Sequence, residues 1–168
     1  YASVITEEEK LICYCRNMAV DAVIHFYAGE LREKGIPFEC DMMLPQNIGI
    51  SDTDLCKIYG NLLENAVFHA KGMTELTLSV SLVGDKAVFE VADNGCGIPD
   101  DALQKIFSGS YEKSAAPVDG TRSNMGIGLS VCAAIVKAHN SEITAENRKG
   151  GGAVFRFALE RGGEDDGQ

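Results

Sequence analysis

Residues 91–99 read Val-Ala-Asp-Asn-Gly-Cys-Gly-Ile-Pro and directly follow an alternating apolar run that predicts a β-strand. Gly95 and Gly97 let the backbone approach a planar ligand closely, and the Asp93 carboxylate at the strand end can accept a hydrogen bond from an exocyclic amine. The same residues also suit an ordinary turn, because Asp-Asn-Gly is a common turn sequence. Taken alone, this stretch leaves both interpretations open.

Two further segments carry polar groups at the ends or faces of predicted helices. Asn61 and Asn65 lie four residues apart in a predicted helix over 51–70, so they share one face. An amide oxygen can enter the octahedral shell of magnesium, although a mid-helix Asn can also simply face water. The sequence GIGL at residues 126–129 opens another predicted helix, and a helix start presents free backbone N–H groups to phosphate oxygens.

Periodicity and turn residues predict the rest of the secondary structure. Apolar residues at helical spacing predict one long helix, or two short ones, over 6–34, ended by Gly35. The remaining predicted elements are a strand at 36–42, a hairpin with arms near 76–82 and 87–91, a helix at 126–139 and strands at 142–147 and 153–159. A stretch over 107–125 is rich in Gly, Ser, Pro and Asp, which predicts a mobile loop.

Composition narrows the function classes. The chain has 168 residues, 45% of them hydrophobic and 24% charged, which predicts one packed domain. Its net charge of -10 has the wrong sign for many phosphate contacts and argues against nucleic acid as a partner. The six cysteines form no CxxC pair, so we interpret them as structural thiols in a reducing compartment. No apolar run approaches the ~20 residues of a spanning helix, and a chain that starts at Tyr1 is expected to be a piece of a longer protein.

The order and spacing of these segments resemble the GHKL family of ATP-binding domains, and most closely the catalytic domain of sensor histidine kinases. NLLENA is similar to the N box of that family, DNGCGIP to its first glycine box, GIGLS to its second, and KGGGAVFRF to its terminal glycine-rich turn and strand. The resemblance covers residues 51–160. In the front half, CRNMAVDAVIHFY and the strand after it are similar to the subfamily of peptide-sensing, quorum-sensing receptor kinases.

The resemblance implies an α+β fold of the Bergerat type. This is a two-layer sandwich in which three helices cover a mixed, mostly antiparallel sheet. Residues 1–160 would then form a single ATP-binding domain with a flexible ATP lid at about 107–125. Residues 161–168 are expected to be a disordered tail.

The resemblance also implies roles for single residues in binding ATP and magnesium. Asn65 would be the catalytic residue and magnesium ligand, Asn61 would lie near the triphosphate, and Asp93 would bond the adenine amine. Gly95, Gly97 and Ile98 would shape the base pocket. The other implied ATP contacts lie on the helix, the lid and the second glycine box: His69, Tyr111, Lys113, Gly126, Ile127, Gly128 and Leu129. For His69 a packing role is the alternative, and for Lys113 simple solvation.

The same resemblance implies a reaction and partners. Family members that hydrolyse ATP carry a glutamate base at the position of Asn61, and an amide cannot take that proton, so phosphoryl transfer is favoured. An acid follows the phosphoacceptor histidine of the family, and none follows His25, His69 or His139. The acceptor is therefore expected on upstream dimerisation helices of the same protein. The full-length protein is expected to be a homodimer and to pass the phosphoryl group to a response regulator.

Other readings remain open. The domain is expected to be the cytoplasmic part of a membrane-anchored bacterial receptor, without direct membrane contact of its own. The alternatives are a serine kinase of the anti-sigma type and a nucleotide-binding scaffold without activity. The scaffold reading draws on Phe68, which stands where many histidine kinases carry a lysine, and on a lid that keeps little of the family motif.

Overall fold

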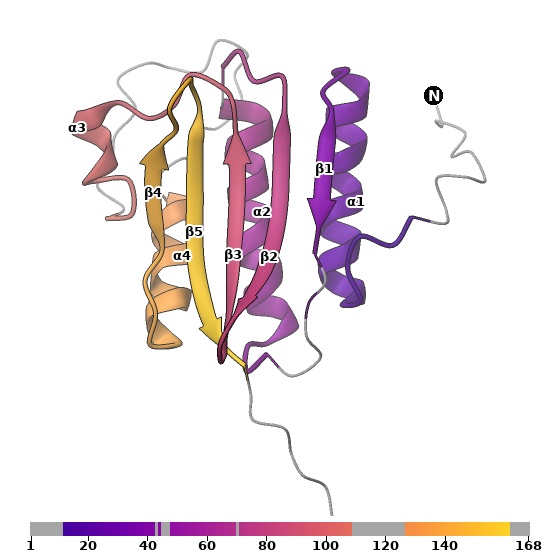
Figure 1. Cartoon of the computed structure of the whole chain (residues 1–168), viewed down its shortest axis with the longest axis vertical. Helices are drawn as coiled ribbons and strands as arrows, with labels where there is room; N and C mark the ends of the chain where they lie inside the picture. The colour runs from indigo at the N-terminus through magenta and orange to yellow at the C-terminus, as the bar shows by residue number, and fades with distance from the viewer. Residues whose placement is uncertain (1–11, 43, 45–47, 70, 109–126, 162–168) are drawn as a thin grey trace, which may run out of the picture.

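The structure is a computed structural model that describes residues 12–42, 44, 48–69, 71–108 and 127–161. A five-stranded sheet with the order β1-β2-β3-β5-β4 forms one layer, and α1, α2 and α4 lie together behind it (Figure 1). Only β1 and β2 run parallel; the other neighbouring strands are antiparallel. The expected two-layer α+β sandwich is confirmed. The elements are α1 Met18–Glu33, β1 Phe38–Asp41, α2 Asp52–His69, β2 Leu76–Val83, β3 Lys86–Asp93, α3 Asp100–Leu103, α4 Ile127–Ala138, β4 Thr144–Asn147 and β5 Ala153–Glu160.

The core lies between the sheet and α2, the central helix of the helical layer. Alternate residues of β3 and β5 point into it, because side chains along a strand alternate between its two faces. Phe89 and Phe157 stack with ring centroids 4.7 Å apart, and the buried Tyr59 of α2 packs against both rings. This packing fixes the height of α2 over the sheet and therefore the height of the asparagines that α2 carries.

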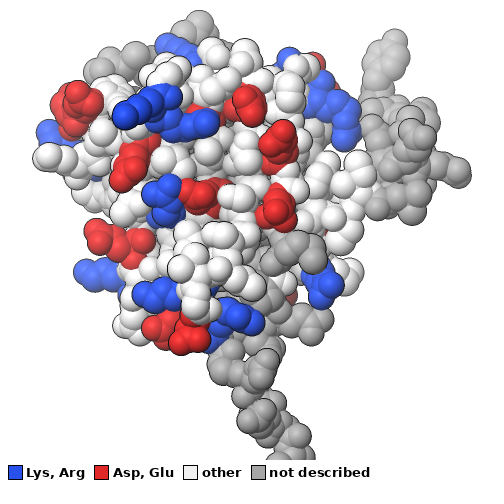
Figure 2. Space-filling view, in the orientation of Figure 1, with Lys and Arg blue, Asp and Glu red and all other residues white. Residues whose placement is uncertain are grey.

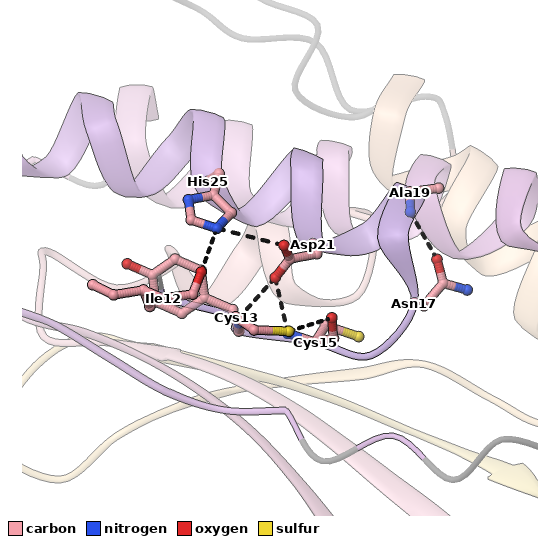
Figure 3. Close-up of polar contacts among 8 residues, drawn as sticks. Ile12, Cys13, Cys15, Asn17, Ala19, Asp21 and His25 are labelled. Carbon is pink, nitrogen blue, oxygen red and sulfur yellow. Dashed lines mark hydrogen bonds and ion pairs between the residues drawn. The ribbon is translucent and has the colours of Figure 1, made fainter. Parts of the chain in front are cut away.

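The first helix is shorter than the sequence predicts. The prediction of a helix over 6–34 is wrong at its start, since α1 begins at Met18 and residues 12–17 are not helical; residues 1–11 lie outside the described part. The side chain of Asn17 caps the helix there, because it accepts a hydrogen bond from the backbone N–H of Ala19 at 3.1 Å (Figure 3). It also accepts one from the N–H of Val20 at 3.1 Å.

The segment before α1 is held against the helix instead. One carboxylate oxygen of Asp21 accepts hydrogen bonds from the N–H groups of Tyr14 and Cys15, at 2.7 and 3.0 Å. One turn further along, His25 Nε2 lies 2.7 Å from the carbonyl oxygen of Ile12 (Figure 3). The apolar periodicity continues into this segment because Cys15 is buried in the core, but its N–H groups bond to a side chain rather than to a helix ladder.

The other predicted elements are confirmed to within a few residues. Gly35, at a φ of 67°, follows the C-cap of α1, and Asp54 donates its backbone N–H to Ser51 Oγ at the start of α2. The short helix α3 was not predicted. The expected tail over 161–168 begins one residue too early, because Arg161 pairs with Ile48 and donates its N–H to the carbonyl of Asp85. Residues 162–168 lie outside the described part.

The face of the sheet opposite the helices is polar. Acidic and basic side chains are interspersed over it (Figure 2), and Arg156 forms an ion pair with Glu90 on the neighbouring strand. Among the described helices, none is both long and apolar enough to cross a membrane. The six cysteines are free thiols, and burial raises the pKa of Cys40 and of Cys132 to about 12, so both are protonated at neutral pH.

Candidate functional site

Of the two asparagines of α2, Asn61 faces the start of α4. Asn61 donates its side-chain amide to the carbonyl of Lys57, one turn earlier, at 2.8 Å. Its Oδ1 faces Gly128 so closely that a Cβ built on that glycine would lie 2.5 Å away. On the facing helix, the thiol of Cys132 donates to the carbonyl of Ile58 at 3.7 Å. The helices α2 and α4 therefore meet through Asn61, and only a residue without a side chain fits opposite it.

Asn65 lies one turn further along α2 and is 9% exposed. Its Nδ2 is buried and has no hydrogen-bond partner within the part of the chain that the structure describes. A buried polar atom without a partner is costly, so such groups usually mark a site that another molecule completes. The two asparagines share one helix face but differ in their hydrogen bonds. The side-chain nitrogen of Asn61 has a protein partner, and that of Asn65 has none among the described residues.

Asp93, the last residue of β3, is 5% exposed and accepts a hydrogen bond from the N–H of Gly95 at 2.8 Å. Burial raises the pKa of this carboxyl above its ordinary value. The hydrogen bonds from the backbone N–H groups of Gly95 and Ala153, and then the charge of Arg148, oppose that rise. A carboxylate has about four acceptor positions, so beyond these two donors it can still accept a hydrogen bond from a ligand amine.

The glycine segment after β3 is held from both sides. Asn94 accepts hydrogen bonds from the N–H groups of Thr74 and Glu75, each at 2.9 Å, and donates its amide to Thr74 Oγ1. Gly97 takes a φ of 73°, a conformation that favours glycine. Ile98 is 6% exposed and packs in the core. The resemblance placed the base pocket here, and the structure gives the segment one defined conformation.

Two residues of this region were missed by the sequence analysis, and both lie at the end of β4. Asn147 forms two hydrogen bonds with the backbone of Ile98, and Arg148 Nη1 donates to the carbonyl of Asp93 at 2.9 Å. The signal available in the sequence was weak: an amide and a cation between a predicted strand and the run Gly150-Gly151-Gly152.

The start of α4 is described only from Ile127 onward. Gly128 faces Asn61 as above, and Leu129 is fully buried. Gly126 and the lid residues Tyr111 and Lys113 lie outside the described part, as do positions 109–125 of the expected lid. The backbone of His69 ends α2, and its side chain is likewise outside the description. Among the described residues of the expected site, the structure therefore brings Asn61 against Gly128 at the start of α4 and Asp93 against Gly95.

Phe68 stands at the position where the resemblance led us to expect a lysine. Its ring is 49% exposed, and the ammonium group of Lys34 lies 4.7 Å from the ring centroid. Lys34 also donates to the carbonyl of Val67 at 2.9 Å. A cation from the end of α1 thus lies beside the surface of α2 at this position.

The described residues fit a magnesium ion only if substrate phosphates and water supply most of its ligands. Within the described ranges there is no cluster of three or more His, Cys, Asp or Glu side chains that could hold a metal ion. Magnesium is commonly bound by one or two protein oxygens together with substrate phosphates and water. In Asn65 the atom without a partner among the described residues is the amide nitrogen Nδ2, a donor suited to a phosphate oxygen. The oxygen of the same amide would be the single protein ligand that such a site requires.

Comparison with known proteins identifies the family of the chain and several of its relatives. The family described as histidine kinase-, DNA gyrase B- and HSP90-like ATPase matches residues 51–163. The chain is 34% identical over 136 residues to sensor protein KdpD of Escherichia coli strain K12, which covers 77% of this chain and 14% of KdpD. It is 40% identical over 102 residues to the signal transduction histidine-protein kinase AfsQ2 of Streptomyces coelicolor, covering 61% and 18%. The chain therefore spans less than a fifth of the length of these relatives.

A solved structure covers nearly the whole chain. The nucleotide-free catalytic domain of histidine kinase ThkA matches with a TM-score of 0.70 and 26% sequence identity, over 87% of this chain and 92% of that one. The similarity thus extends in front of residue 51, beyond the segment that the family matches.

Proposed function

The chain belongs to the histidine kinase-, DNA gyrase B- and HSP90-like ATPase family, and from that membership we propose that it is the ATP-binding catalytic domain of a sensor histidine kinase. In this proposal the domain transfers the γ-phosphoryl group of ATP to a histidine on the upstream dimerisation helices of its own protein. The full-length protein is then a homodimer that passes the phosphoryl group to a response regulator.

One observation carries the proposal most directly. Asn65 is buried on α2, and its Nδ2 has no partner among the described residues. Leaving such a group unsatisfied costs about 1–3 kcal/mol. That cost is reasonable at a site where ligand binding completes the hydrogen bonds. We infer that the amide of Asn65 faces the phosphates and that its oxygen binds magnesium.

The other residues divide the remaining tasks of binding. The carboxylate of Asp93 accepts a hydrogen bond from the adenine amine, and the segment with Gly95 and Gly97 surrounds the base. Backbone N–H groups at the start of α4, around Gly128, face the phosphate oxygens. When bound, magnesium neutralises charge on the phosphoryl group being transferred, which is the main demand of this reaction.

Transfer rather than hydrolysis follows from Asn61. Its amide already donates to the carbonyl of Lys57, and its oxygen faces Gly128. A carboxamide has no basic site that could take a proton from water, so this position cannot activate a water molecule. The described histidine side chains are also engaged elsewhere: His25 contacts Ile12 and Asp21, and His139 lies 3.9 Å from Asp54. We place the acceptor on a histidine outside this chain, because no acid follows His25, His69 or His139 as it does after the acceptor of the family.

The first test is calorimetric titration of ADP and a non-hydrolysable ATP analogue, with and without magnesium. We expect the chain to bind both, Asp93→Ala to abolish binding, and Asn65→Ala to remove the dependence on magnesium. Absence of binding by the parent chain would overturn the proposal.

The second test supplies the purified dimerisation helices of the full-length protein and labelled ATP. Label on histidine, which is labile to acid, supports the kinase. Label on serine would instead identify a serine kinase of the anti-sigma type. Tight nucleotide binding without transfer of label would favour a scaffold without kinase activity. The observation that supports this second candidate is Phe68, an uncharged residue where many histidine kinases carry a lysine.

The narrower subfamily and the location are part of the same proposal. The front-half resemblance includes a C-x-N-x-x-x-D pattern formed by Cys15, Asn17 and Asp21, and all three residues have structural roles at the start of α1. We infer that the domain belongs to a peptide-sensing receptor kinase and lies on the cytoplasmic side of a membrane-anchored protein, where ATP is available. Autophosphorylation of the full-length receptor in vesicles should then respond to a peptide on the opposite side; indifference to any secreted peptide would contradict the assignment.

A further inference from the structure

We propose that Asn147 is a positioning residue of the nucleotide pocket, whose side-chain amide holds the turn at Gly97 and Ile98 in the shape that receives the base. The inference rests on the proposed ATP site. It assigns a role in base recognition to a residue outside the N box and both glycine boxes.

The contact is a complete pair of hydrogen bonds between segments that are distant in sequence. Asn147 Oδ1 accepts from the N–H of Ile98 at 2.8 Å, and Asn147 Nδ2 donates to the carbonyl of Ile98 at 2.7 Å, across a separation of 49 residues. One amide therefore satisfies both polar groups of the Ile98 backbone, as a neighbouring strand would. Ile98 lies beyond the end of β3, where no strand of the sheet is paired with it.

The surrounding contacts show that the whole segment rests on the turn between β4 and β5. A Cβ on Gly97 would lie 2.7 Å from Asn147 Oδ1, and one on Gly152 would overlap the carbonyl oxygen of Asp93. Arg148 binds that same carbonyl. The connection from β3 toward α3 passes this turn at one end of the sheet (Figure 1). Contacts with the turn between β4 and β5 therefore fix the backbone at Asp93 and Ile98.

An amide is the side chain that this contact requires. It combines one acceptor and two donor hydrogens on a rigid plane, whereas an ionised Asp offers acceptors only. The segment it holds contains Gly95 and Gly97, and glycine has the greatest conformational freedom in an unrestrained loop. Fixing such a loop before the ligand arrives removes an ordering cost from binding, which is the physical basis of preorganisation.

The experiment compares Asn147→Ala, Asn147→Asp and the control Glu146→Ala in the full chain. Glu146 is the exposed neighbour on β4. The ligands are ADP and IDP, because the base of IDP lacks the amine that Asp93 would recognise. Asn147→Ala is expected to weaken ADP binding about tenfold, because the variant must order this segment when the ligand binds. It should also reduce the preference for ADP over IDP. Asn147→Asp should fall between the parent and Asn147→Ala, and the control should match the parent.

A second measurement follows the two Asn147–Ile98 hydrogen bonds in the absence of nucleotide. Hydrogen exchange at the amide of Ile98 should accelerate in Asn147→Ala and stay unchanged in Glu146→Ala. Equal loss of ADP and IDP binding would mean a merely structural role and would overturn the inference, as would unchanged exchange at Ile98. If the parent binds neither nucleotide, the proposed ATP site and the base-positioning role both fail, while exchange still reports whether Asn147 holds the turn.

Discussion

Asn61 and Gly128 lie so close that a methyl group on the glycine would sit 2.5 Å from the amide oxygen of the asparagine. The contact joins the middle of α2 to the first turn of α4, the two helices that carry the expected phosphate-binding groups. The contact also explains why residue 128 is a glycine. A side chain there would fit only if Asn61 moved and gave up its hydrogen bond to Lys57.

The first prediction tests this contact. Gly128→Ala should lower the free energy of unfolding by about 1–3 kcal/mol through overpacking and should weaken nucleotide binding. In an Asn61→Ala background the same substitution should cost clearly less, which chemical denaturation of the four proteins in a double-mutant cycle would measure. Gly29→Ala is the control, since a Cβ there meets nothing within 4 Å, and it should stabilise α1 by about 0.5–1 kcal/mol. Additive effects at Gly128 and Asn61 would contradict the contact.

The second prediction separates stability from function at Asn65. Asn65→Leu removes a buried polar atom that has no partner among the described residues and replaces it with an apolar group of similar size. We expect the free energy of unfolding without nucleotide to stay the same or to rise by about 1 kcal/mol. Nucleotide binding should lose its dependence on magnesium. Thermal unfolding and titration calorimetry on the same samples measure both, and a strongly destabilised variant with intact binding would refute the assignment.

The third prediction concerns pH and Asp93. Burial raises the pKa of this carboxyl in the folded chain above its unfolded value. The folded state therefore holds the proton more strongly, and the contribution of Asp93 to stability is full below the unfolded pKa and is lost as pH rises through the folded pKa. Relative to Asp93→Asn, the parent should lose stability as pH rises from about 3 and level off above the folded pKa.

Chemical denaturation of both proteins at a series of pH values provides the measurement. Nucleotide binding should change in the opposite sense, weakening as pH falls through the raised pKa, because only the ionised carboxylate has both oxygens free to accept hydrogen bonds. A stability difference that does not vary with pH would show that Asp93 titrates normally.

The fourth prediction concerns the segment before α1. In Asp21→Ala the N–H groups of Tyr14 and Cys15 lose their acceptor, so we expect a loss of about 1–3 kcal/mol in the free energy of unfolding and faster tryptic cleavage after Arg16. Asp21→Asn keeps an oxygen at the same place and is the matched control, with a much smaller effect. Cleavage rates that are equal in the two variants would show that Asp21 does not hold this segment.

Much of the fold could be predicted from local patterns. Alternation predicted the hairpin of β2 and β3, and the four-residue spacing of Asn61 and Asn65 placed both on one face of α2. These features depend on residues that are close in the chain. The four-residue helix α3 escaped prediction because it is too short to show a helical period.

The start of α1 was mispredicted for a tertiary reason. Cys15 is buried, so the apolar pattern continues past the true start of the helix. The helix itself begins only where Asn17 caps it, and Asp21 binds the N–H groups that a longer helix would have used. Hydrophobic periodicity reports burial, and burial does not require a helical backbone.

By itself, the sequence determined the class of domain, through its separate motifs in their order, and the helix and strand faces from which they project. Only the tertiary structure decided that the side-chain nitrogen of Asn65 has no partner among the described residues, while that of Asn61 donates to Lys57. Only the tertiary structure, too, placed Asn147 in hydrogen-bonding contact with Ile98. The physical reason lies in the sheet: β5 pairs with both β3 and β4, opposing Ala92 to Val154 and Asn147 to Ala153. That pairing brings the turn after β4 beside the end of β3, and no local pattern records a contact made across such a distance in the chain.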